Sequence, residues 1–261
     1  MPILGFLIGT VASLTGIGGG VFIVPLLTMA YSFAPANAVG TSLTAIIFTA
    51  LAATLNYSRQ RRIYYKTGVV LALTTAPGAV LGAYLTTIIP ARQLGLIFGF
   101  FLIFVALRMV IDLQSLRQRS SVVEQKRPQR VVRSETELFR STGVMILGCF
   151  LSFFGGLASG LLGIGGGVLL VPIITLTMGI PIHFATATSM FTMIFTSISG
   201  VTQHFLANHI SFEYALLLAL GTVLGAQIGA YTSRRVSGKN LRLIFGVMLL
   251  VVSIQMILKY I

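Results

Sequence analysis

One short stretch of this chain occurs twice, once in each half. Residues 14–28 have the sequence LTGIGGGVFIVPLLT, and residues 161–175 have the sequence LLGIGGGVLLVPIIT. Both copies keep the GIGGG cluster and the proline that follows it, and a shift of 147 residues carries Gly16 onto Gly163 and Pro25 onto Pro172. An internal repeat of this kind predicts a fold assembled from two copies of one structural unit.

The same shift holds across most of each half. It carries Thr41-Ser42 onto Thr188-Ser189, and GAVLGAY (residues 78–84) onto GAQIGAY (residues 225–231). Between the halves lies a polar stretch rich in arginine. The sequence therefore predicts a first repeat over residues 1–111, a linker over residues 112–141 and a second repeat over residues 142–261.

The composition places both repeats in a membrane. Apolar residues make up 56% of the chain, charged residues only 9%, and the mean hydropathy is +0.95, values outside the range of soluble domains. A bilayer-spanning helix needs about 20 predominantly apolar residues. Six runs meet that need: 38–58, 68–89, 94–111, 185–205, 214–231 and 241–258.

Two further apolar stretches, residues 2–33 and 142–179, are each interrupted by GIGGG. We expect each to form a re-entrant hairpin or a pair of short helices. The predicted fold is an all-α integral membrane protein with two repeats, each combining a glycine-broken N-terminal segment with three full transmembrane helices.

Basic residues predict how the repeats are oriented, because short cytoplasmic loops collect Lys and Arg. The first repeat carries a basic cluster, from Arg59 to Lys66, after its first span, whereas the second carries its cluster, from Arg234 to Arg242, after its second span. If each repeat crosses an odd number of times, all but Arg92 and Lys259 of the 18 basic residues share one side. A single crossing by each broken segment would make the repeats parallel and divide the charges more evenly. We therefore expect inverted repeats in the plasma or inner membrane, with a cytoplasmic linker and both termini outside.

Inverted repeats with broken helices at matching positions are typical of secondary transporters, which bind substrate near the bilayer midplane. Glycine turns can present unpaired backbone N–H groups, and together with the positive end of a helix dipole these form an anion site. Pro25 and Pro172 are expected in the first turn of the helix that follows. The alternative is that the glycines only let helices pack closely, which is the interpretation we favour for the GxxxG pairs in residues 78–84 and 225–231. A dinucleotide fingerprint is disfavoured because the glycine spacing differs.

A polar helical face supplies the second element of the candidate site. Thr188, Thr192, Thr196, Ser199 and Gln203 recur every three or four residues, and the first repeat keeps Thr41, Thr49 and Asn56 on the equivalent line. Such hydroxyls can bind an oxyanion, or they can bond back to their own helix or to a neighbouring one. For Thr41-Ser42 and Thr188-Ser189 we favour the site.

The acidic residues limit the chemistry, because none lies within a predicted span. Cation pumps and proton relays usually need intramembrane carboxylates, so cation pumping is disfavoured. His204 is the one titrating group predicted near the interior, where a helix-end histidine bonded to backbone or water is expected. No cluster has metal-ligand spacing and no nucleophile has a nearby base, so we predict no enzyme, cofactor or metal. The net charge of +13 is interpreted as topology and attraction to anionic lipid headgroups, not as nucleic-acid binding.

The paired GIGGG with its following proline, the segments AVGTS (38–42) and ATATS (185–189), and the two-half layout with a polar centre resemble the TauE/SafE family. That family is also called the sulfite exporter or toluene-sulfonate uptake permease family. The resemblance implies transport of sulfur-containing or organic anions such as sulfite, sulfonates or sulfoacetate.

Carried over to this chain, the resemblance falls on the glycine clusters and the Thr-Ser pairs: Gly16, Gly18, Gly19, Gly20, Thr41, Ser42, Gly163, Gly165, Gly166, Gly167, Thr188 and Ser189. We add Asn56 and Gln203 as residues lining the path. The predicted function is secondary transport of a small anion by alternating access. The alternatives are an anion channel with the same site and a membrane accessory or scaffold protein without transport. The GxxxG faces would permit a homodimer.

Overall fold

The structure is a computed structural model that describes residues 1–104, 107, 142–233, 253–254 and 257–259. The chain divides into two compact units, one of residues 1–91 with 133–235 and one of residues 92–132 with 236–261. The predicted linker, residues 112–141, and most of the predicted span 241–258 lie outside the described residues. The part of the chain that is described contains helices and turns, and no strand.

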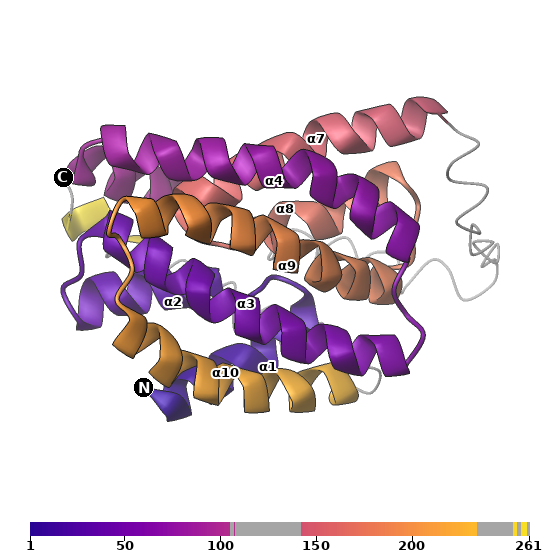
Figure 1. Ribbon diagram of the computed structural model, residues 1–261, viewed down its shortest axis with the longest axis horizontal. Helices are drawn as coiled ribbons and strands as arrows, with labels where there is room; N and C mark the ends of the chain where they lie inside the picture. Colours follow the sequence, from indigo (N-terminus) through magenta and orange to yellow (C-terminus); the bar gives the residue numbers. More distant parts are fainter. Residues whose placement is uncertain (105–106, 108–141, 234–252, 255–256, 260–261) are drawn as a thin grey trace. The chain divides into compact units, whose positions relative to one another are not determined.

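The first unit contains the two glycine clusters and the helices around them (Figure 1). Its first-repeat elements are α1 (Pro2–Thr15), α2 (Gly20–Pro25) with the π-helical η1 (Leu26–Ala30), α3 (Pro35–Arg59) and α4 (Tyr65–Ile88). Its second-repeat elements are α7 (Thr142–Leu162), α8 (Gly167–Pro172) with the π-helical η2 (Ile173–Thr177), α9 (Ile182–Leu206) and α10 (Phe212–Thr232).

Five helices are long and apolar enough to cross a membrane, counting only described residues. Four of them, α3, α4, α9 and α10, confirm predicted spans with small shifts at the ends. The fifth, Gly143–Leu162, is the first arm of the second broken segment. Both broken segments are divided at GIGGG into two helices, and the start of the predicted span 94–111 forms the shorter apolar helix Ala91–Phe104.

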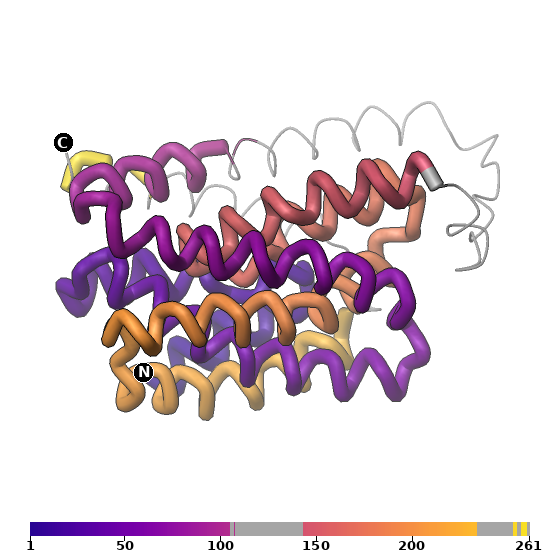
Figure 2. The backbone as a smooth tube through the Cα atoms, turned by 45° about the horizontal axis from the view of Figure 1, so that its top comes forward, coloured from indigo at the N-terminus to yellow at the C-terminus, as the bar shows by residue number. Residues whose placement is uncertain are grey.

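Helices from the two halves of the sequence pack against each other. Helix α1 lies on α10, and its repeat equivalent α7 lies on α4. Between these pairs, α9 packs on α4, α3 packs on α9, and α10 packs on α3, an order that both ribbon and tube show (Figures 1 and 2). Each contact therefore recurs when the two halves are exchanged.

The GxxxG pairs explain how closely these helices approach. A Cβ on Gly82 of α4 would lie 2.1 Å from the carbonyl oxygen of Leu157 in α7, and one on Gly225 of α10 would lie 2.0 Å from that of Phe6 in α1. Only glycine allows backbones to come so near. Close packing is thus confirmed for these motifs, and because the contacts are within the chain, these glycine faces are not available for a dimer.

Helices α3 and α9, which are repeat equivalents, cross each other in opposite directions. Gly40 near the start of α3 lies against His204 near the end of α9, and Leu43, further along α3, lies against Gly200, which precedes His204. The backbone repeats the same way: every described residue with positive φ has a counterpart 147 residues away. In addition to the glycines of the two clusters, Ser32 is equivalent to Gly179 in the repeat, and Arg61 is equivalent to Asn208.

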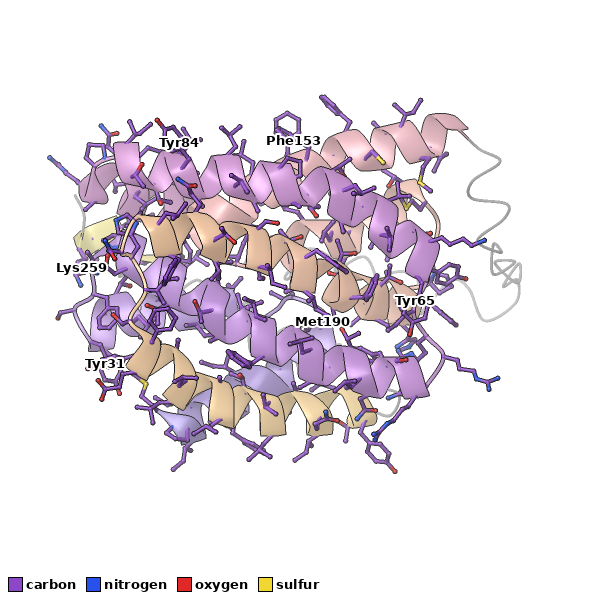
Figure 3. All side chains as sticks on the ribbon, viewed as in Figure 1. Tyr31, Tyr65, Tyr84, Phe153, Met190 and Lys259 are labelled. Carbon is purple, nitrogen blue, oxygen red and sulfur yellow. The ribbon has the colours of Figure 1, made fainter. Side chains whose placement is uncertain are left out.

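Side chains are distributed as a lipid environment requires. The outer face of α10 exposes Leu216, Leu220 and Leu224, each by more than half of its surface, whereas serines and threonines of α3 and α9 are buried inside. Tyr65 and Tyr84 are exposed near opposite ends of α4 (Figure 3). Exposed apolar faces of this extent fit acyl chains and not water. The chain is a multi-pass membrane protein.

Candidate functional site

The two GIGGG clusters form sharp bends in left-handed backbone. In the first bend Gly16, Gly18 and Gly19 have φ values of 77°, 90° and 88°. In the second, Gly163, Gly165 and Gly166 have φ values of 69°, 75° and 84°. Residues with a Cβ rarely adopt this region, so the clusters are needed to turn the chain between the two helices of each broken segment. The predicted turning role of the glycines is confirmed.

The two bends lie against each other. A Cβ on Gly20 would lie 2.0 Å from the carbonyl oxygen of Gly163, and a Cβ on Gly167 would lie 2.2 Å from that of Gly16. These two contacts are repeat equivalents. The last glycine of each cluster is therefore required by the other bend, and the two clusters are in direct contact.

Several buried backbone amides in the bends are left without partners. The amides of Gly16 and Ile17 both donate to Ala12, and those of Phe22 and Ile23 donate to Gly19. Between them, the amides of Gly18, Gly19, Gly20 and Val21 make no hydrogen bond to any residue that the structure describes.

The second bend has the same feature. The amides of Ile164, Gly165, Gly166, Gly167 and Val168 have no hydrogen-bond partner among the described residues. The glycines of both clusters are buried. Buried backbone N–H groups are almost always paired, so two adjacent groups of free donors indicate a place where a ligand or water supplies the acceptor.

The serine of each Thr-Ser pair reaches the bend of the other repeat. The hydroxyl of Ser42 donates to the carbonyl oxygen of Gly163 at 2.8 Å, and that of Ser189 donates to that of Gly16 at 3.3 Å. These hydrogen bonds are made to a carbonyl oxygen of each bend, so they do not involve its backbone amides. In the structure described, each serine thus binds a bend, and its role in binding an anion stays a prediction.

The threonine of each pair lies one step further out. The Thr41 hydroxyl accepts from the amide of Ser211, and the Thr188 hydroxyl accepts from the amide of Tyr64, both at 3.1 Å. Each therefore binds the connection that leads into α10 or α4 of the other repeat. These hydrogen bonds are made to the connections, whereas those of the serines are made to the bends.

The remaining predicted side chains lie elsewhere. Thr192 donates to Thr188 and Gly68, and Thr196 donates to Thr192 and contacts the Thr75 hydroxyl at 2.8 Å. For these two the alternative interpretation, bonding to their own and neighbouring helices, is confirmed.

For Asn56 and Gln203, too, no side-chain contact with the bends is found among the described residues. The Asn56 amide group donates to Gln227 of α10 at 3.1 Å. Gln203 is half-buried on α9, and no contact of its side chain with either bend is found among the described residues.

The expectation for Pro25 and Pro172 is wrong. Helices α2 and α8 begin at Gly20 and Gly167, so each proline ends its helix instead of starting it, and a π-helical turn follows. A proline has no N–H and cannot make the usual intrahelical hydrogen bond. The wider π-helical turn that follows accommodates this missing bond.

Met193 is the residue at this site that sequence reasoning missed. Its terminal methyl would lie 1.9 Å from a Cβ on Gly18 and 2.7 Å from one on Gly165, so it fills the space between the two bends. Met193 is fully buried, and its repeat equivalent Ile46 also contacts the Gly165 position. The alignment of the repeats places a flexible thioether opposite a branched chain, which is a signal that the sequence does carry.

Comparison with known proteins identifies the family of this chain. The family model described as sulfite exporter TauE/SafE matches residues 1–256. Probable membrane transporter protein YunE of Bacillus subtilis is 33% identical over 98% of this chain and 96% of its own length. Probable membrane transporter protein MJ0441 of Methanocaldococcus jannaschii is 27% identical over 98% of this chain and 94% of its own.

A shorter match links the chain to a plant protein. Sulfite exporter TauE/SafE family protein 3 of Arabidopsis thaliana is 32% identical over 36% of this chain and 20% of its own length. No solved structure gives a significant match. From the family model, which covers nearly the whole sequence, the chain belongs to the TauE/SafE family.

Proposed function

We propose that this protein is a secondary transporter that carries a small anion of the sulfite or sulfonate class by alternating access around the two glycine bends. The observation that carries the proposal is the pair of buried bends with free amides. The two bends contact each other at Gly20 and Gly167, and the acidic side chain within the described spans, Glu213, is exposed in the first turn of α10. Uncharged donors of this kind suit an oxyanion.

The arrangement of the helices supports inverted repeats. Helices α3 and α9 are equivalent in the repeat and run antiparallel. In addition, Arg62, which follows α3, donates to the Ser233 hydroxyl at 2.9 Å and to the His183 carbonyl at 3.0 Å. The end of α3, the start of α9 and the end of α10 therefore meet. Arg62 belongs to the basic cluster of the first repeat, and Ser233 is the residue before Arg234, where the cluster of the second repeat begins in the sequence, so this contact supports an inverted arrangement.

Met193 favours a transporter over a channel with the same site. In this proposal the path of the anion runs between the bends, where the Met193 side chain closes it, and the unbranched thioether has the freedom to move aside. Alternating access then combines movement of Met193 with rocking of one group of helices against the other.

The experiment that tests the proposal is flux into liposomes containing the purified protein. Uptake of sulfite, methanesulfonate, sulfate and acetate is measured with and without a pH gradient. We expect saturable uptake of sulfite or methanesulfonate that exceeds acetate uptake. Uptake that does not saturate and cannot be driven uphill would identify a channel, and no uptake of any anion would contradict the proposal.

A further inference from the structure

The repeat builds one side-chain pair at both ends of the crossed helices α3 and α9, with different chemistry at each end. Tyr57 and Arg62 of the first repeat are the equivalents of His204 and His209 of the second. The Tyr57 hydroxyl donates to the carbonyl of Ser13, and the Nε2 atom of His204 lies 3.3 Å from the carbonyl oxygen of Gly160, the equivalent of Ser13.

The outer member of each pair lies close to the ring of the inner one. The Arg62 guanidinium carbon lies 5.2 Å from the centre of the Tyr57 ring, and the ring centres of His204 and His209 are 5.8 Å apart. Both inner residues are fully buried. Equivalent positions of the two repeats are thus occupied by a tyrosine and an arginine at one end of the crossed helices and by two histidines at the other end.

The two ends differ in whether their charge depends on pH. A guanidinium stays protonated at every physiological pH, whereas an imidazole gains and loses its charge between about pH 5 and pH 8. The Nδ1 atoms of both His204 and His209 are buried and have no hydrogen-bond partner within the described residues. Buried polar atoms normally have a hydrogen-bond partner. The two unpaired Nδ1 atoms therefore offer a position that can bind a proton, and a protonated Nδ1 could then donate to an acceptor such as water or an anion.

Contacts connect the histidine pair to the glycine bends. A Cβ on Gly40 would lie 2.6 Å from the His209 carbonyl oxygen and 3.1 Å from the His204 Cβ. Gly40 directly precedes Thr41 and Ser42, and Ser42 holds the second bend through Gly163. Gly160, the partner of His204, lies one turn before Gly163 on the same chain. The histidine pair is therefore connected to the second bend by contacts through α3 and through α7.

We propose that His204 and His209 form a proton-binding site that makes anion passage depend on pH, with protonated His209 taking at its end the place that Arg62 holds at the other. This inference rests on the proposed function of the glycine bends. A positive charge near the route attracts the anion, and a bound anion in turn favours the protonated histidine, because coupling between two sites is reciprocal.

The charge at this end of the crossed helices depends on the two histidines, as the groups around them show. The backbone of Gly40 on α3 and that of Gly160 on α7 lie against the pair, and the nearest carboxylate along the chain is Glu213, exposed in the first turn of α10. The other ionisable side chains on elements packed against α9 are Tyr57 and Arg59 on α3, Tyr65, Lys66 and Tyr84 on α4, and Cys149 on α7. Partial burial lowers the pKa of His209, so its charge is present at acid pH and absent at alkaline pH. Passage should accordingly rise as the pH falls.

Methanesulfonate uptake into liposomes at a series of pH values tests the proposal, because this anion stays ionised throughout. The variants are His209→Gln, which cannot be charged, His209→Arg, which copies Arg62, and His204→Tyr, which copies Tyr57. His183→Gln is the matched control, since His183 is exposed at the opposite end of α9.

The wild type and H183Q should take up methanesulfonate roughly tenfold faster at about pH 5.5 than at about pH 8. H209Q should be slow at both values, H209R fast at both, and H204Y should have a weakened pH response. A flat wild-type profile with clear uptake, or an H209Q profile like that of the wild type, would overturn the proton site and leave the transport proposal standing. A wild type that takes up no anion would overturn both.

Discussion

The hydroxyl of Ser42 donates a 2.8 Å hydrogen bond to the carbonyl oxygen of Gly163, so that a side chain of one repeat holds the glycine bend of the other. Its counterpart, from Ser189 to Gly16, is longer at 3.3 Å. Both bonds are buried.

Replacing Ser42 with alanine should destabilise the protein more than replacing Ser189. Loss of a buried donor that leaves its acceptor unsatisfied costs about 1–3 kcal/mol. We expect S42A to lower the melting temperature and slow anion uptake, and S189A to do so less. The control is S58A, because Ser58 is exposed on α3. Equal melting temperatures for S42A and S58A would contradict this role for the bond.

Substitutions in the glycine bends should stop transport. G19V and G166V place a β-branched residue at φ values of 88° and 84°, where a side chain costs about 1–2 kcal/mol or more. G20A adds a Cβ 2.0 Å from the Gly163 carbonyl oxygen. In contrast, a Cβ at Gly143 meets nothing within 4 Å, so G143A is the matched control. Liposome uptake should be lost in the first three variants and kept in G143A; normal uptake by both G19V and G166V would refute the role of the bends.

Shortening Met193 should relax selection by size. M193A removes the methyl that fills the space between Gly18 and Gly165, whereas M193L keeps most of the volume. We expect M193A to raise uptake of benzenesulfonate relative to methanesulfonate, and M193L to change the ratio little. An unchanged ratio in M193A would show that Met193 does not line the path.

Labelling can test the inverted orientation. In a Cys149→Ser background, single cysteines at Lys66 and Arg235 should both resist a membrane-impermeant maleimide added to intact cells, and a cysteine at Arg92 should react. Lys66 is exposed at the start of α4, so access alone would not protect it. Reaction of one of the two protected positions without the other would place the basic clusters on opposite faces.

The sequence predicted the long helices and the bends well because two strong signals carry them. Apolar runs of sufficient length define α3, α4, α9 and α10, and glycine clusters define the positions of left-handed backbone, since few other residues adopt it. The predicted orientation across the membrane stays a prediction.

The partners of individual side chains could not be predicted. Thr41 and Ser42 are neighbours in a helix, yet Ser42 contacts a bend and Thr41 contacts the connection before α10, because adjacent residues point in different directions. The role of Met193 depends on packing between repeats, and the place of Pro25 depends on where α2 begins; neither follows from local spacing.

The most direct measurement of the central claim is anomalous diffraction from crystals of the Cys149→Ser variant soaked in selenite, the selenium counterpart of sulfite. The account predicts one selenium peak between the bends, within hydrogen-bond distance of the free amides of Gly18 to Gly20 or Gly165 to Gly167. Selenium bound only elsewhere, in crystals of a protein that takes up selenite in liposomes, would contradict it.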